Sequence, residues 1–109
     1  MGKASRVKGF AFERKIAIAL RVVWPNARRH LEYQDAVCFG VDIAETDHWK
    51  FQCKKLKSYA SVNTINEVKC DRMIGEVPVL VTAGDNLEAM AVLPFDELVR
   101  LLQNQKSKL

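Results

Sequence analysis

The most constraining feature of this sequence is a pair of short apolar runs, each interrupted by polar residues, within residues 40–57. Residues two apart in a β-strand point to the same side, so Gln52 and Lys54 project together if the second run is a strand. A hairpin between the two runs would bring Asp42 beside them. The runs are Gly40-Val41-Asp42-Ile43 and Phe51-Gln52-Cys53-Lys54.

These residue types suit the hydrolysis of a phosphodiester, in which a metal polarises a phosphate oxygen and activates water. Mg²⁺ prefers hard oxygen ligands, so Asp42 is the first ligand candidate, followed by the Gln52 amide oxygen and the Cys53 backbone carbonyl. Lys54 could orient the attacking water or stabilise developing negative charge. Glu13 lies next to the apolar face of the first predicted helix, and it could complete the site directly or through a metal-bound water.

Length and composition favour one folded domain over residues 1–109. The chain is 49% hydrophobic and 28% charged, and no run of about 18 apolar residues predicts a membrane span. The N-terminus lacks the apolar stretch of a secretory signal. Cys38, Cys53 and Cys70 form an odd set without metal-ligand spacing, which favours reduced thiols and a cytoplasmic location.

The net charge of +4 is modest, but its distribution is segregated. Residues 1–30 hold eight Lys/Arg and a single acid, residues 31–47 hold five acids and no Lys/Arg, and residues 50–57 hold four lysines. A basic frame around an acidic centre is typical of a polyanion partner whose phosphate meets a metal site. Scattered lysines of an ordinary soluble domain are the alternative.

The apolar periodicity predicts the order α-β-β-β-α-β-β-α, an α/β fold with a central mixed sheet flanked by helices. The expected helices span residues 8–23, 62–74 (capped by Ser61) and a final segment that begins after Pro94, with Phe95, Leu98, Val99 and Leu102 as its apolar stripe. The expected strands cover residues 28–33, 41–44, 49–55, 77–82 and 87–93. Residues 45–48 form the hairpin turn, and residues 103–109 a frayed tail.

Taken together, Glu13, Gly40-Val41-Asp42 and Gln52-Cys53-Lys54 resemble the PD-(D/E)XK nuclease superfamily. Its pattern is a helix glutamate, a strand aspartate and Glu/Gln-X-Lys on the next strand. The Gln-Cys-Lys version resembles the Mrr-like restriction endonucleases. The short length and the opening residues 8–13 look like the archaeal and phage Holliday-junction resolvases. The resemblance covers residues 6–82 and implies a restriction-endonuclease-like core.

The resemblance implies a Mg²⁺-dependent endonuclease, with Mn²⁺ as a substitute, that acts on four-way or other branched DNA as a homodimer in a prokaryotic or phage-infected cell. An Mrr-like restriction or repair nuclease on duplex DNA is the second reading. A non-catalytic DNA-binding module is the third, because Gln52 is neutral where glutamate is commoner, and a lost charge weakens a divalent-cation site. A small α/β domain with chance residues is the fourth.

Six basic residues are the candidate DNA contacts. Those within residues 1–7 would form a basic arm laid along DNA, although a solvated terminus is the alternative. Alternation turns Lys55 away from Lys54, as a surface residue or a phosphate contact. The six are Lys3, Arg6, Lys8, Arg14, Lys55 and Lys57.

Overall fold

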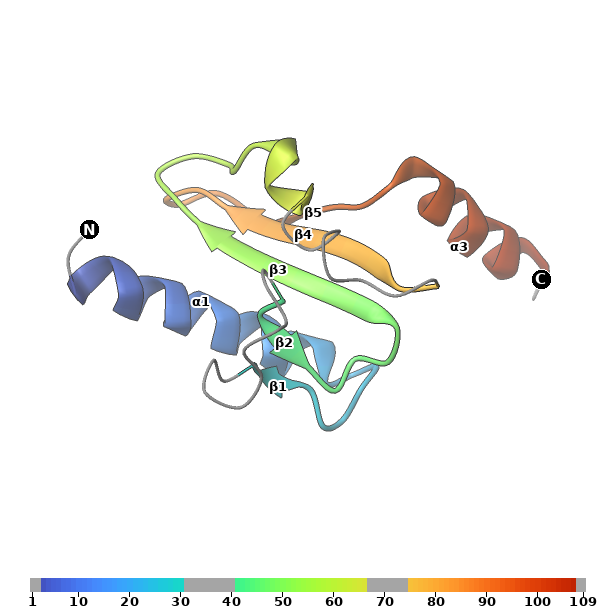
Figure 1. Ribbon diagram of the computed structural model, residues 1–109, viewed down its shortest axis with the longest axis horizontal. Helices are drawn as coiled ribbons and strands as arrows, with labels where there is room; N and C mark the ends of the chain where they lie inside the picture. The colour runs from blue at the N-terminus through green and yellow to red at the C-terminus, as the bar shows by residue number, and fades with distance from the viewer. Residues whose placement is uncertain (1–2, 31–40, 67–74, 108–109) are drawn as a thin grey trace.

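The computed structural model describes residues 3–30, 41–66 and 75–107 of the chain, an α/β fold with two helices and a mixed three-stranded sheet (Figure 1). None of the helices in these segments has the length and apolar character needed to cross a membrane. In chain order the elements are α1 (Lys3–Leu20), β1 (Arg28–Arg29), β2 (Ile43–Ala44), β3 (Trp49–Lys55), the 3₁₀ helix η2 (Val62–Ile65), β4 (Val77–Ala83), β5 (Met90–Val92) and α3 (Phe95–Ser107).

The main sheet has the order β3-β4-β5, and β4 is its fully buried central strand. β3 and β4 run parallel over their full lengths, from Trp49 opposite Val77 to Lys55 opposite Ala83, whereas β5 pairs antiparallel with β4. β1 and β2 form a second, antiparallel pair. One backbone hydrogen bond joins the two sheets, donated by the Asp42 N–H to the Phe51 carbonyl at 2.8 Å.

The hydrophobic core lies between α1 and one face of the sheets. Phe12, Ile16 and Ala17 of α1 are buried against Phe51 and Cys53 of β3 and against alternate residues of β4. Because side chains alternate along a strand, the residues between these, among them Gln52 and Leu80, point to the opposite face. That face is covered in part by the segment around η2, where the Ala60 N–H donates to the Thr82 hydroxyl at 2.8 Å.

Several predicted elements are confirmed. β3 has the predicted bounds, β4 extends the prediction by one residue, and Ser61 caps η2 by accepting from the Asn63 N–H. The hairpin is confirmed in part. Residues 45–48 form a turn closed by the Trp49 N–H on the Thr46 carbonyl, but β2 takes β1 as its ladder partner and β3 takes β4.

Other predicted boundaries were wrong. α1 begins five residues before the predicted start and ends at Leu20, so Val22 and Val23 lie exposed in a turn. The predicted second helix begins as the 3₁₀ turn η2 and Asn66 is helical, while residues 67–74 lie outside the described residues, so its length stays a prediction. Strand 87–93 shortens to β5, because residues 84–87 form a turn closed by the Leu87 N–H on the Gly84 carbonyl. The predicted frayed tail is helical as far as Ser107.

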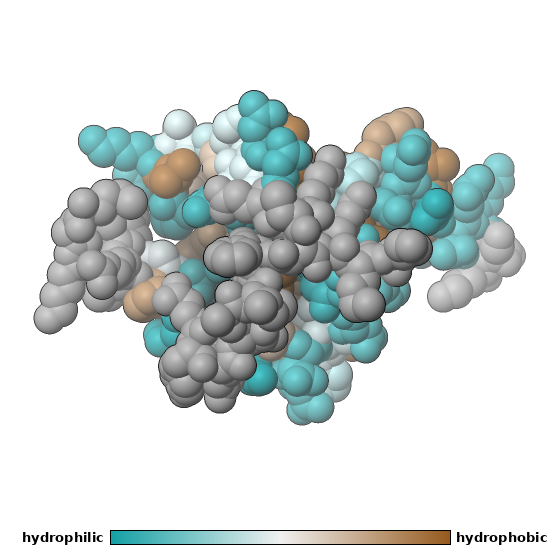
Figure 2. Space-filling model, viewed as in Figure 1, coloured by the Kyte–Doolittle hydropathy of each residue, from teal (hydrophilic) through white to brown (hydrophobic). Residues whose placement is uncertain are grey.

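The orientation of α3 was not predicted. Its side that carries Glu97, Leu101 and Asn104 lines a groove against the ends of β3 and β4, while its apolar stripe faces away from the sheet. Phe95 is 73% exposed and Leu102 is 58% exposed. Hydrophobic residues accordingly appear on the surface over α3, at the upper right of the space-filling view (Figure 2).

Two glycines offer a matched test of this packing. A Cβ at Gly84 would lie 2.6 Å from Leu87 Cδ1 and 2.8 Å from the Ser58 Cα, whereas a Cβ at Gly9 would meet nothing within 4 Å. We expect Gly84→Ala to lower the free energy of unfolding by about 1–3 kcal/mol, since backbone must move. Gly9→Ala should raise it by about 0.5–1 kcal/mol through helix propensity. Urea unfolding measures both, and equal values for the two variants would contradict the packing around Gly84.

Candidate functional site

Asp42 links the two sheets through hydrogen bonds of both its backbone and its side chain. Its backbone N–H donates to the Phe51 carbonyl, and its carbonyl accepts from the His30 N–H at 2.7 Å. Its side chain then replaces the next backbone partner, because Asp42 Oδ2 accepts a 2.7 Å hydrogen bond from the Cys53 N–H. The carboxylate is therefore fixed at the edge of β3, beside Gln52 and Lys54, as the hairpin prediction required.

Alternation also places three of the predicted residues on one face. Ile43 belongs to the core under α1, so Asp42 beside it points to the opposite face. Gln52 and Lys54 point to that same face, because Phe51 and Cys53 belong to the α1 core. Lys54 is half-buried, but Gln52 is only 1% exposed, and its Oε1 atom receives no hydrogen bond from the described residues.

Glu13 approaches from the other layer. It lies on α1, where its Oε1 accepts a 3.2 Å hydrogen bond from Arg29 Nε in a largely buried ion pair. The Arg29 guanidinium also lies over the Phe10 ring, 4.3 Å from its centroid, which adds a cation–π contact. Arg29 therefore fixes the Glu13 side chain and offsets its charge.

The Cys53 thiol shows that both carboxylates act on the same small region. Burial is the main cause that raises the pKa of this thiol, and the negative charges of Asp42 and Glu13 raise its pKa further. These charges reach Cys53 from the sheet edge and from the helix. The thiol remains neutral, so it contributes to packing and offers no thiolate for nucleophilic or metal chemistry.

We tested whether these residues fit a Mg²⁺ ion. The N–H and C=O of one residue leave a strand on the same side, so the Cys53 carbonyl faces the edge that holds the Asp42 carboxylate. These two hard oxygens fit part of a Mg²⁺ shell, and Mg²⁺ keeps several waters. Glu13 lies on α1 and is paired with Arg29, and its contact through a metal-bound water stays a prediction. Within the described segments, no three His, Cys, Asp or Glu side chains form a metal-binding group.

The predicted DNA contacts are spread along the chain. Lys3, Arg6 and Lys8 belong to α1, because the helix begins at Lys3 and no separate arm precedes it within the described residues. Arg14 and Lys57 are exposed. Lys55 is half-buried, and its Nζ donates to the Gly84 carbonyl at 2.8 Å, which ties it to the turn after β4.

Sequence reasoning missed Arg29 and His30. The signal for Arg29 was available, since alternation along residues 28–30 places it on the face opposite Arg28 and His30, toward the helix that carries Glu13. His30 is the cross-strand neighbour of Asp42, because Arg29 pairs with Ile43 in the antiparallel register. That register depends on tertiary pairing, so no local pattern predicts it.

Comparison of the chain with protein-family models, with curated proteins and with solved structures found no match.

The Cys53 environment gives a direct test of the site's geometry. Because the pKa of the Cys53 thiol is raised, the folded protein carries less Cys53 thiolate at pH 8 than an unfolded chain, in which a thiol has a pKa of about 8.5. We expect iodoacetamide to modify Cys53 at least about tenfold more slowly in the folded protein than in urea. Peptide mass spectrometry follows this residue alone. The raised pKa also makes folding stability depend on pH. Stability falls as the pH rises above the thiol's unfolded pKa, because the unfolded chain then loses a proton that the folded protein keeps. Equal labelling rates would contradict the burial.

Proposed function

We propose that this protein is a metal-dependent DNA endonuclease with a restriction-endonuclease-like core. The observation that carries the proposal is the placement of Asp42 against the Cys53 N–H, which sets one carboxylate beside the Gln-X-Lys segment of the neighbouring strand. The order of elements supports the proposal, because a helix with Glu13 precedes the strands and a parallel β3–β4 pair follows.

Each residue has a role on this proposal. Asp42 and the Cys53 carbonyl hold Mg²⁺ or Mn²⁺, which supplies a polarised phosphate and an activated water. Gln52 adds an amide oxygen, and Glu13 orients a water from the helix side. Lys54 lies on the same face as Asp42, where its ammonium stabilises charge on the phosphate during attack. Arg29 keeps Glu13 in place through their 3.2 Å ion pair.

The substrate we propose is branched DNA, most specifically a four-way junction. The support is the combination in the sequence of Gln-Cys-Lys with the opening residues 8–13 and the segregated basic segments. Cleavage of linear duplex and binding without cleavage are the competing outcomes, and one experiment separates them.

The decisive variant is Asp42→Asn. Asparagine retains an oxygen that accepts from the Cys53 N–H, so the local fold is kept while the metal-binding charge is lost. We expect its rate of junction cleavage with Mg²⁺ to fall by about a hundredfold or more, since metal stabilisation is worth several kcal/mol. Its affinity for the junction in Ca²⁺ should change little.

The assay uses a labelled four-way junction and a matched linear duplex with the full-length protein. Paired nicks in the junction alone support the proposal, and equal cutting of duplex assigns the protein to duplex cleavage instead. Binding without cleavage by the wild type assigns a DNA-binding module. Glu88→Gln, at an exposed position before β5, removes the same charge elsewhere and should cleave normally. Undiminished cleavage by Asp42→Asn would refute the site.

We also propose that the protein acts as a homodimer through α3, since two nicks in one junction require two sites. Phe95, Leu98 and Leu102 form an exposed apolar stripe that the sheet does not cover. α3 carries acids in its first turn, Asp96 and Glu97, and Lys106 in its last turn. A second copy packed antiparallel on this stripe matches apolar with apolar, and it sets acidic turns beside basic ones.

The test of this surface is Leu102→Glu, which places a charge on the stripe. We expect light scattering after size exclusion to shift the mass from two chains to one at micromolar protein. Gln103→Glu adds the same charge at the next exposed position, off the stripe, and should remain dimeric. A wild type that is monomeric throughout this range, or a Leu102→Glu dimer, would refute the interface.

A further inference from the structure

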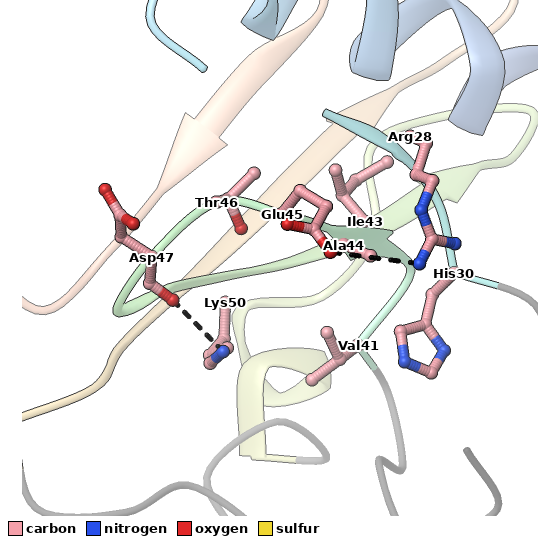
Figure 3. A pocket seen from close by; sticks show the side chains of 9 residues that line it. All are labelled: Arg28, His30, Val41, Ile43, Ala44, Glu45, Thr46, Asp47 and Lys50. Atoms are coloured by element: carbon pink, nitrogen blue, oxygen red, sulfur yellow. Dashed lines mark hydrogen bonds and ion pairs between the residues drawn. The ribbon is translucent and has the colours of Figure 1, made fainter. Parts of the chain in front are cut away.

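We propose that the pocket beside Asp42 is a second phosphate subsite, which holds a phosphate of the DNA strand next to the one that is cleaved. This inference rests on the proposed function for the identity of the strand, but its geometry is independent of it. The pocket has a volume of about 350 Å³ and is formed by β1, β2, the following turn and the start of β3 (Figure 3).

Three cationic or potentially cationic side chains line this pocket. Arg28 of β1 and His30, the residue after β1, are two apart and lie on one face, and Lys50 lies on the face of β3 that carries Gln52 and Lys54. In the close view Arg28 and His30 lie at the right, Lys50 lies to the left, and Glu45 lies between them (Figure 3).

Its position relative to Asp42 follows from the strand pairing. His30 is the cross-strand neighbour of Asp42, and Lys50 precedes Gln52 by two residues on one face of β3. Residues two apart on a strand are separated by about 6.6 Å. A nucleic-acid strand whose reacting phosphate lies at Asp42 thus has a charged lining within about one nucleotide's reach.

Glu45 is the acid of the pocket lining that contacts Arg28, and Arg28 Nη1 also donates to the Arg29 carbonyl at 3.5 Å. Asp47 turns its carboxylate to Trp24, whose indole Nε1 donates to it at 2.9 Å, and offers the pocket only its carbonyl, which accepts from Lys50. Lys50 is also paired with Glu76 at 3.2 Å. Glu45 contacts Arg28 at 3.9 Å, with the two side chains about half exposed, so their attraction is weak.

Glu45 therefore occupies the place of a ligand anion on Arg28. A phosphate diester presents oxygens that a guanidinium binds with paired, charge-assisted hydrogen bonds, which are stronger than a long, solvated carboxylate contact. The volume lies at the low end of small-ligand pockets, enough for a phosphate with its sugar. Glu45 then competes with DNA for Arg28.

The test compares two arginine–glutamate pairs. Arg28–Glu45 lines the pocket, and Arg100–Glu97 is a similar surface pair on α3. Junction binding is measured in Ca²⁺ across a range of salt, with thermal melting to confirm folding. Arg28→Gln should weaken binding about tenfold and reduce the slope of log affinity against log salt by about 0.9, the value for one lost phosphate contact. Arg100→Gln should leave the slope unchanged.

Glu45→Gln gives the opposite sign and keeps the test valid if an arginine variant fails to fold. It should strengthen binding more than Glu88→Gln, which removes the same charge at an exposed position away from the pocket. Equal effects of the two glutamate variants, or equal salt slopes for the two arginine variants, would overturn the subsite.

A second measurement distinguishes this inference from the nuclease proposal. Side-chain NMR signals of Arg28 and His30 are followed during addition of thymidine 5′-phosphate, with uncharged thymidine as the control. Shifts caused by the nucleotide alone support a phosphate site. If the protein neither binds nor cuts DNA, the same shifts assign the pocket to free nucleotides. In that case the nuclease proposal fails and the phosphate subsite stands. The absence of shifts overturns the subsite even if cleavage is observed.

Discussion

The hydrogen bond from the Cys53 N–H to the Asp42 carboxylate is the interaction on which the candidate site depends. Asp42 directly precedes β2, and its side chain satisfies a β3 donor that would otherwise lack a partner at this edge. A hydrogen bond to a charged acceptor is stronger than one between neutral groups, so it holds the carboxylate in place without a metal. The same bond joins the two sheets and sets the register between Asp42 and Gln52.

The two faces of the sheet divide stability from chemistry. The face under α1 is apolar, and Glu13 on that helix is paired with Arg29. The opposite face carries Asp42, Gln52 and Lys54 from the strands that the apolar face anchors. A rigid strand positions such groups better than a loop does, since packing on one side limits movement on the other.

The predictable part of this fold is the part that local pattern determines. β3 and β4 follow from alternation and from an apolar run, and the pairing of Asp42 with the Gln-X-Lys segment follows from a short connection. The failures depend on distant contacts. β2 pairs with β1 and not with β3, and the Arg29–Glu13 pair depends on where α1 packs. The α3 stripe was predicted to be apolar, but periodicity does not say which surface covers it.

The neutral amide of Gln52 links metal binding to substrate binding on the proposed function. A glutamate at this 1% exposed position would carry a large desolvation cost, which the amide avoids. The neutral amide also reduces the negative charge available to a metal. Arg29 offsets the charge of Glu13, so Asp42 is the principal negative charge for a divalent ion. Fewer charges weaken metal affinity. A phosphate brought in by the DNA supplies the missing negative charge, so metal and substrate each strengthen the binding of the other, a reciprocity that thermodynamic linkage requires.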